Sequence, residues 1–367
     1  MESPQNPKKT GWAAIVATFL ALLVIVAIIL MLFLPSIVAS LGNIVHFNGG
    51  YYTSTYGVNT YNNNNGGSTS PNSPAIYNSA VTITYPQDYQ TLLNYTLGLI
   101  NSDRANAGLS PVTASPIQSA QQHADSMLFF KYFSHWDTQG YKPYMRYTIL
   151  NGTGFVEENV AYEYTSLPTY LNTGSVKNAL ATLENQMVYN DSACCNNGHR
   201  DNILNQYHNR VSIGIAYDST HVYFVEDFET FYVQLNAPLV SSGNEVRLVG
   251  TTLEPINPNS IMVFYDSVPS NLSSSSLNTD YYGPYNQGNF VGGVLPHCGS
   301  LVGCPQYEGY ITVYADNWQV NSSAVNIAFS LNSLVSKYGS GVYTIYMIQG
   351  SQNNPEYLTS LSIFETS

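Results

Sequence analysis

The longest hydrophobic run of the chain lies close to its start. Residues 12–34 are almost entirely apolar and carry no charge. About twenty such residues can cross a bilayer as a helix, so the pattern predicts a transmembrane anchor over residues 11–35. Lys8 and Lys9 come just before the run. Because basic residues stay on the cytoplasmic side, residues 1–10 are expected in the cytoplasm and the bulk of the chain outside the cell.

Two other interpretations of this segment stay open. A secretory signal peptide could be cleaved near residues 38–40, although its apolar core is usually shorter than the run seen here. A pilin-type signal cleaved near Gly11 would instead make the same segment the core of a filament.

The next segment, residues 36–86, is of low complexity. It is rich in Tyr, Asn, Ser, Gly and Pro and includes the stretch YNNNNGGSTSPNSP. Such a composition cannot bury enough apolar surface to offset the entropy lost on ordering. We expect a flexible stalk between the membrane and the first domain.

Helical periodicity begins after the stalk. Residues 88–108 place Leu92, Leu93, Leu97 and Ile100 on one stripe. Two further helices are predicted over residues 115–130, with the start at Ser115, and over residues 176–189, and strands over residues 211–219 and 221–230. Residues 87–236 are therefore predicted to form one α+β domain.

The remaining residues, 237–367, change to short strand-like runs separated by Gly, Pro, Asn and Ser. Seven such runs can be distinguished, over residues 245–253, 260–268, 289–295, 310–316, 324–331, 341–350 and 358–365. Regularly spaced short strands are typical of a β-sandwich, and we expect one of immunoglobulin-like type.

Charge is scarce throughout. The 367 residues are 44% hydrophobic, 9% charged and include 31 tyrosines, with a formal net charge of −12 at pH 7. This balance argues against a nucleic-acid partner, because phosphate binding needs a basic face. Carboxylates titrate near pH 4, so a surface of Asn, Ser, Thr and Tyr keeps its hydration in acid. The cell surface of an archaeal thermoacidophile fits this composition.

Cysteines and glycosylation sequons agree with an exterior location. In an oxidising exterior Cys298 and Cys304 could close a short loop, whereas Cys194 and Cys195 could form a vicinal disulfide or remain two thiols. These cysteines could also bind a metal, but the sequence offers no third or fourth ligand at zinc-finger spacing from them. Five candidate glycosylation sites begin at Asn94, Asn151, Asn190, Asn271 and Asn321.

The stretch GHRDNIL concentrates charge in this charge-poor chain. It holds His199, Arg200 and Asp201 in consecutive positions. One interpretation is a histidine that binds a metal or a ligand. The other is a helix start, in which Asp201 stabilises the helix dipole and the neighbouring side chains anchor the turn.

Several segments together resemble one known family. In chain order they are NSDRANAGLSPV, HADSM, FSHWDTQGYKPYMR, EENVAYEY, GHRDNIL, VSIGIAY and YFVEDF. Across residues 88–231 their order and spacing are similar to the CAP superfamily, which includes cysteine-rich secretory proteins, venom allergens and pathogenesis-related proteins. The resemblance implies an α-β-α sandwich with a central antiparallel sheet.

The resemblance also implies a cleft lined by two histidines and two acids. Matched by position, the histidines are His135 of FSHWDT and His199 of GHRDNIL, and the first acid is Glu158 of ENVA. Glu184 is the nearest residue to the second acid. Two neutral imidazoles are suitable ligands for a divalent metal such as zinc, and nearby carboxylates can orient them. Below about pH 6 we expect both histidines to be protonated and to lose the metal.

The sequence leaves two classes of function. In the first, the anchored domain is a binding or adhesion module at the cell surface, whose cleft holds a metal, a lipid or a glycan. In the second, it is a cell-surface hydrolase acting on peptides or envelope polymers with a metal-bound water. We favour the binding module, because no G-x-S-x-G, H-E-x-x-H, S-x-x-K or phosphate-binding motif is found in the sequence.

Overall fold

The structure is a computed structural model of the whole chain. The residues that it describes are 51–58, 79–86, 89–236, 240–241, 244–299, 303–351 and 354–365. The predicted tail and anchor lie outside these residues. Across the described ranges, we find no helix that combines the length and the apolar character needed to span a membrane.

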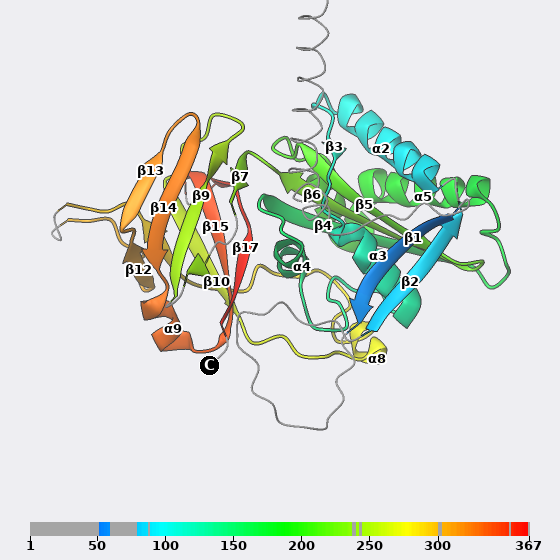
Figure 1. Ribbon diagram of the computed structural model, residues 1–367. Helices are drawn as coiled ribbons and strands as arrows, with labels where there is room; N and C mark the ends of the chain where they lie inside the picture. Colours follow the sequence, from blue (N-terminus) through cyan, green and yellow to red (C-terminus); the bar gives the residue numbers. More distant parts are fainter. Residues whose placement is uncertain are drawn as a thin grey trace, which may run out of the picture.

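The first domain is a four-stranded sheet with helices on both faces (Figure 1). The strand order is β3-β5-β6-β4, and the pairs β4–β6 and β5–β6 are antiparallel whereas the short β3 runs parallel to β5. The elements are α2 (Tyr89–Asn106), β3 (Thr113–Ala114), α3 (Ser119–Phe130), α4 (Pro143–Ile149), β4 (Phe155–Tyr164), α5 (Thr173–Tyr189), α6 (Ser192–Cys195), α7 (Gly198–Ile203), β5 (Arg210–Tyr217) and β6 (His221–Thr230).

Helices α2 and α5 lie on one side of this sheet and α3 on the other (Figure 1). The close approach of α3 depends on Gly214 of β5, because a Cβ there would lie 2.1 Å from the carbonyl oxygen of Ala120. Side chains alternate between faces along a strand. Neighbouring residues of β4 and β6 therefore contact different helices, which matters for the site below.

The predicted helices are present, with one shifted boundary. Leu92 and Ile100 of α2 are fully buried, as the periodicity predicted. Helix α3 begins at Ser119 rather than at the predicted Ser115. The reason is local, because the Ser115 hydroxyl accepts a hydrogen bond from the main chain of Ile117 and closes a turn before the helix.

The segment predicted to be a stalk contains regular structure. Strands β1 (Tyr51–Val58) and β2 (Ser79–Pro86) pair in an antiparallel ladder over their full length. The expectation of a segment without secondary structure is therefore wrong for these two stretches.

The second domain consists of two sheets that share one core. One has the order β12-β11-β10-β15-β16, with β17 also on β15, and the other has the order β13-β14-β9-β7, with β8 also on β9. Leu248 and Ile327 from one sheet pack in the same cluster as Val263 and Ile345 from the other. The elements are β7 (Val233–Leu235), β8 (Val240–Ser241), β9 (Glu245–Thr252), β10 (Ser260–Asp266), α8 (Ser274–Leu277), β11 (Asn289–Leu295), β12 (Ile311–Tyr314), β13 (Asn317–Val320), β14 (Ala324–Ser330), α9 (Asn332–Tyr338), β15 (Gly341–Ser351), β16 (Asn354–Tyr357) and β17 (Leu361–Glu365).

All seven predicted strand runs of this domain form strands. Two details differ from the sequence-based expectation. Strand β7 pairs with β9, so the second domain begins at about Val233, before the predicted boundary at residue 237. Strands β11 and β12 run parallel, so their sheet is mixed. The immunoglobulin-like topology stays a prediction.

One connection of the second domain reaches back to the first. Residues 267–288 join β10 to β11 and carry the short helix α8, which lies beside the first domain and away from its own sheets (Figure 1). We call this segment the crossover. Its Leu272 main chain donates to the carbonyl of Thr138, and the Ser274 hydroxyl donates to the carbonyl of Phe130.

Candidate functional site

His135 is fixed by a carboxylate from the edge strand of the first sheet. It follows α3 in an irregular segment, and its Nδ1 lies 2.9 Å from Oε1 of Glu158 on β4. The Glu158 side chain is fully buried and that of His135 is about one-tenth exposed. A buried carboxylate at Nδ1 orients the ring and leaves Nε2 as the nitrogen free to bind a ligand.

Arg146 of α4 binds the second carboxylate oxygen of Glu158. Its Nη2 donates to Oε2 of Glu158 at 2.5 Å, and its Nη1 donates to the main-chain carbonyl of His135 at 2.7 Å. One guanidinium thus positions both the carboxylate and the backbone that carries the imidazole. Planar, multidentate binding of this kind is typical of arginine.

Burial changes how the pair titrates. Burial, the charge of His199 and the charge of Arg146 lower the pKa of His135 to about 3. Burial raises the pKa of Glu158 to about 7, against the opposing effect of Arg146. The prediction that both histidines are protonated below about pH 6 is therefore wrong for His135. Its ring stays neutral in moderately acidic solution, chiefly because burial disfavours the charged imidazolium and also because Arg146 and His199 lie near it.

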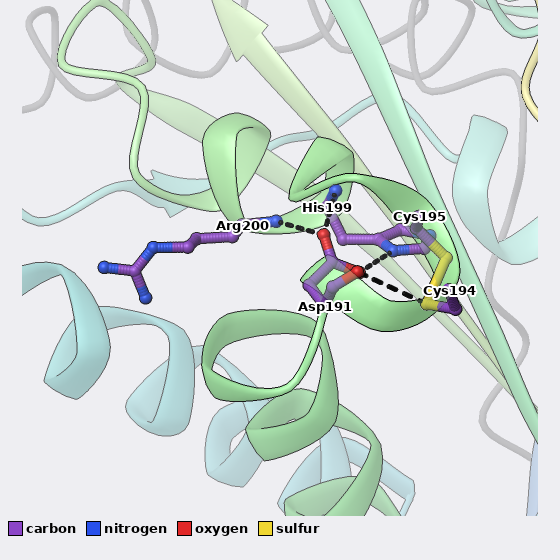
Figure 2. The surroundings of a disulfide bond; sticks show 5 residues. All are labelled: Asp191, Cys194, Cys195, His199 and Arg200. Carbon is purple, nitrogen blue, oxygen red and sulfur yellow. Dashed lines mark hydrogen bonds and ion pairs between the residues drawn. A yellow bond between two sulfur atoms is a disulfide. The ribbon is translucent and has the colours of Figure 1, made fainter.

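His199, the second predicted histidine, has its own carboxylate. Its Nδ1 lies 2.7 Å from Oδ1 of Asp191, a buried residue just before α6. The other oxygen of Asp191 accepts from the main-chain nitrogens of His199 at 2.8 Å and Arg200 at 3.2 Å (Figure 2). Asp191 therefore caps the start of α7 and orients its histidine at the same time.

The remaining polar residues of GHRDNIL support the fold. Nη1 of Arg200 donates to the carbonyl of Val188 in the last turn of α5. Asp201 lies exposed in the first turn of α7. The interpretation as a helix start is thus confirmed, and binding of a metal or a ligand by His199 stays a prediction.

The two histidines approach β4 from opposite faces of the sheet. Glu158 bonds His135 on the α3 side, and the next residue, Asn159, points the other way and donates to the main-chain carbonyl of His199 at 3.2 Å. Because β4 is an edge strand, the two segments can meet beyond it. The effect of His199 on the pKa of His135 agrees with two rings that lie near each other.

Glu184, the predicted second acid, makes a different contact. It is buried on α5 and shares a hydrogen bond with Glu226 of β6, and burial together with the charge of Glu226 raises its pKa well above the usual value. The carboxylate that bonds His199 is Asp191 instead. The predicted tetrad of His135, Glu158, Glu184 and His199 therefore becomes two His–carboxylate pairs, with Asp191 in place of Glu184.

Strand β6 adds buried carboxylates that sequence reasoning missed. Asp227 is the direct cross-strand neighbour of Glu158 and shares a hydrogen bond with it, and the Ser119 hydroxyl of α3 also donates to Asp227. Burial and the charge of Glu158 raise the pKa of Asp227 well above its usual value. A protonated Asp227 can donate to Glu158, and this hydrogen bond from the neighbouring strand β6 helps to fix the Glu158 carboxylate. The run of acids in VEDFE was the available signal.

The second domain contributes an aromatic side chain to the site. Tyr285 of the crossover accepts a hydrogen bond at its hydroxyl from the main-chain nitrogen of Glu158 at 3.1 Å. Its ring centroid lies 4.9 Å from that of His135. The contact satisfies an edge-strand N–H and covers one side of the imidazole.

The structure also shows the bonding of the cysteines and the exposure of the candidate glycosylation residues. Both predicted pairs are disulfides, one between Cys194 and Cys195 and one between Cys298 and Cys304. The candidate glycosylation residues are all exposed, namely Asn94, Asn151, Asn190, Asn271 and Asn321. Glycosylation of these residues stays a prediction.

The donor set fits a divalent ion. In both pairs a carboxylate occupies Nδ1, so each Nε2 can offer a lone pair. Imidazoles that zinc binds are commonly held in this way by a second-shell carboxylate. His135 and His199 are therefore the residues that would hold such an ion, with Glu158 and Asp191 orienting them.

Comparison with known proteins places the first domain in a family. The model of the cysteine-rich secretory protein family, CAP, matches residues 97–235. A solved extracellular protein containing an SCP domain from Bacillus anthracis is 18% identical, with a TM-score of 0.30, over 41% of this chain and 46% of that chain. The CAP domain of enterococcal PrgA is 16% identical, with a TM-score of 0.27, over 37% of this chain and 58% of that one.

This chain thus spans 46% and 58% of the lengths of those two solved proteins. No curated protein matches it. The family match agrees with the order of the sequence segments. It also agrees with the observed sheet flanked by helices, around which His135, Glu158 and His199 are placed. Residues 97–235 therefore form a CAP domain.

Proposed function

We propose that this protein is a membrane-anchored CAP protein that acts as a binding module on the outside of the cell. Its site holds a divalent metal between His135 and His199, and a lipid or glycan is the larger ligand. The observation that carries the proposal is the matched pair of imidazoles, each with Nδ1 held by a carboxylate.

The exterior location has separate support. The apolar run of residues 12–34 is long enough to span a bilayer. The matched structure from Bacillus anthracis is named as an extracellular protein. Both described disulfides suit an oxidising exterior. Anchoring would keep the module at the surface, with the second domain as a spacer or a contact for a partner.

The site would bind its ion through side chains that are already oriented. Burial keeps His135 neutral, so its Nε2 needs to lose no proton above about pH 4. A bound zinc ion supplies a Lewis acid that can attract a carboxylate, phosphate or hydroxyl group of a ligand. Tyr285 beside His135 offers an aromatic surface on which a sugar ring or an acyl chain can pack.

Zinc titration by calorimetry tests the proposal. The oxidised full-length chain at pH 7.5 should bind one zinc ion, and His135→Ala and His199→Ala should each weaken binding by at least about 100-fold, because each removes a direct ligand. His221→Ala is the matched control, since His221 pairs with Asp218 at the start of β6. Unchanged zinc affinity in both site variants would refute the metal site.

A surface hydrolase is the second candidate, and one observation favours it. Burial brings the pKa of Glu158 to about 7, which is suitable for a general base that works near neutral pH. The same carboxylate, however, bonds Arg146 and His135, so it would have to exchange a partner to accept a proton. The hydrolase is favoured if wild type turns over peptide or envelope-polymer substrates and the double variant His135→Ala/His199→Ala does not. Ligand binding without turnover favours the module.

A further inference from the structure

Four side chains with metal-binding atoms meet beside α6. They are Asp191, Cys194, Cys195 and His199, and one ligand atom from each lies within 4.8 Å of the others. Nδ1 of His199 and Sγ of Cys194 lie 2.7 Å and 3.6 Å from the same Oδ1 of Asp191 (Figure 2). A sulfur in a disulfide carries no proton to donate, so the sulfur–oxygen approach is a contact between two electron-rich atoms.

The Cys194–Cys195 disulfide adds little as a structural crosslink. It joins neighbouring residues, and a disulfide restricts the unfolded chain less as the loop that it closes becomes shorter. Cys298–Cys304 closes a longer loop, with a sequence separation of 6. Cys194 is also exposed and Cys195 partly so, whereas Asp191 behind them is buried. A reductant can therefore reach the sulfurs without unfolding the domain.

From this arrangement we infer that reduction of the Cys194–Cys195 disulfide creates a zinc site made of two thiolates, His199 and Asp191. A dithiol, either a small molecule or a redox protein, transfers two electrons and two protons to the disulfide and becomes a disulfide itself. Zinc then displaces the two thiol protons to solvent, and the His199 ring changes tautomer, with its proton moving from Nδ1 to Nε2 through solvent so that the Nδ1 lone pair can bind the metal. Two sulfurs, one imidazole nitrogen and one carboxylate oxygen form a four-coordinate donor set of the kind that zinc prefers.

The geometry requires only small movements. With zinc–ligand bonds of about 2.0–2.3 Å, the ligand atoms of a tetrahedral site lie about 3.3–3.8 Å apart. The ligand atoms of the four side chains already lie within 4.8 Å of one another, so each has to move by little to reach these distances. Asp191 is already held by the main-chain nitrogens of His199 and Arg200 through its other oxygen. Two of the four ligands are thus positioned before any metal arrives.

This site differs from the proposed His135–His199 site but shares one ring with it. In the oxidised protein Asp191 binds the Nδ1 proton, and Nε2 of His199 is free. In the reduced protein Nδ1 itself becomes a ligand. Reduction would therefore move metal from the His135 side of His199 to the cysteine side, and the two sites can be separated by redox state and by mutation.

Cobalt binding to the full-length chain provides the test, because thiolate–cobalt bonds give a charge-transfer absorption that histidine–oxygen sites lack. The protein is reduced with a phosphine, which does not itself offer a thiol to the metal. Reduced wild type and the variant Cys298→Ser/Cys304→Ser should bind one cobalt ion with this absorption, and added zinc should remove it. The oxidised protein should show no such absorption.

The matched variant Cys194→Ser/Cys195→Ser should lose the absorption and bind zinc at least roughly 100-fold more weakly under reducing conditions, whereas His221→Ala, outside both sites, should leave both unchanged. Absorption that is missing from reduced wild type, or that persists in Cys194→Ser/Cys195→Ser, overturns the inference. Because wild type is compared with itself in two redox states, a variant that folds poorly does not decide the outcome. Zinc binding to the oxidised protein reports on the proposed function separately.

Discussion

Each functional histidine depends on one carboxylate, and the two carboxylates are held in different ways. Glu158 is bound by Arg146 and by the shared proton of Asp227, so it belongs to the core of the sheet. Asp191 is bound by main-chain nitrogens at a helix start. Loss of either carboxylate would free an imidazole to rotate, but only loss of Glu158 would also leave a buried arginine unpaired.

Asp191 and Glu184 can be compared directly. Asp191→Asn in the oxidised protein should weaken zinc binding roughly 10- to 100-fold, because a second-shell carboxylate that orients a ligand is lost. Glu184→Gln should leave the zinc affinity unchanged, since Glu184 bonds Glu226 on β6. Calorimetry on the two variants measures the difference. Equal loss in both, or a larger loss in Glu184→Gln, would contradict the assignment of Asp191.

The residues of the site differ in how far the sequence predicts them. His135, Glu158 and His199 lie in short segments with a family-like spacing, and the structure brings two of them, His135 and Glu158, into direct contact. Asp191 lies in the stretch YNDSACCNNG, whose left-handed residues Asn196 and Asn197 follow no helical or strand period. No periodic pattern could show that its carboxylate turns back toward His199.

Among the elements, β6 is unusual because it buries three acids. Glu226, Asp227 and Glu229 are each at most 1% exposed. Burial raises the pKa of Glu226 and of Glu229 to about 7, and it raises the pKa of Asp227 well above the usual value of an aspartate. Their hydrogen-bond partners include Ser119 of α3, Tyr147 of α4 and Glu184 of α5, so the strand connects both helical layers through carboxyl groups that prefer to be protonated.

These acids should make the protein more stable in mild acid than at neutral pH. A carboxyl whose folded pKa is about 7, against about 4.3 when unfolded, stabilises the fold below pH 4.3 and loses that contribution as the pH rises to 7. The lowered pKa of His135 acts in the opposite sense, adding stability from about pH 3 to 6.5. We therefore expect the urea midpoint to be highest near about pH 4–5 and lower at pH 8.

Glu229→Gln isolates one of these groups. The amide can still accept from the Tyr147 hydroxyl but does not ionise. The free energy of unfolding falls between pH 4.5 and pH 8 in wild type, and in the variant this fall should be smaller by on the order of 3 kcal/mol. Glu308→Gln, at an exposed position, should follow wild type. A urea midpoint that rises from pH 4.5 to pH 8 in wild type would refute this account.

At the level of elements, the sequence predicts well where the apolar period is regular. The stripe of α2 and the seven strand runs of the second domain are examples. The composition of residues 36–86 does not predict the pairing of β1 with β2, although the local run of Tyr and Thr favours strands. Strand β7 pairs with β9 of the second domain, and three residues are too few for the sequence to predict such a distant partner.

Considered as a whole, the molecule is joined across the open edge of β4. The main-chain nitrogens of Val156 and Glu158 on that edge donate to Ser360 and Tyr285 of the second domain. An apolar seam continues the contact, where Phe155 packs with Tyr346. Nζ of Lys142, also at the seam, lies 2.7 Å from the Asp266 carboxylate. The second domain therefore protects an edge strand that would otherwise be exposed.

Removal of the Tyr285 ring should open the site. Tyr285→Ala is expected to increase the rate at which diethyl pyrocarbonate modifies His135 severalfold, because the ring that covers one side of the imidazole is lost. Peptide mapping by mass spectrometry follows the modification of each histidine. Tyr310→Ala, which changes a half-exposed tyrosine of the second domain, is the control and should have no effect. An unchanged rate at His135 in Tyr285→Ala would show that the ring does not limit access.

The crossover has a consequence for how such a protein diversifies. Residues 267–288 lie outside the matched segment of 97–235, yet they place Tyr285 against His135. Substitutions or insertions there would alter what reaches the imidazole while every residue of the matched segment stays the same. The ligand that the site admits can thus change through a loop of the second domain without any change to the two His–carboxylate pairs of the first.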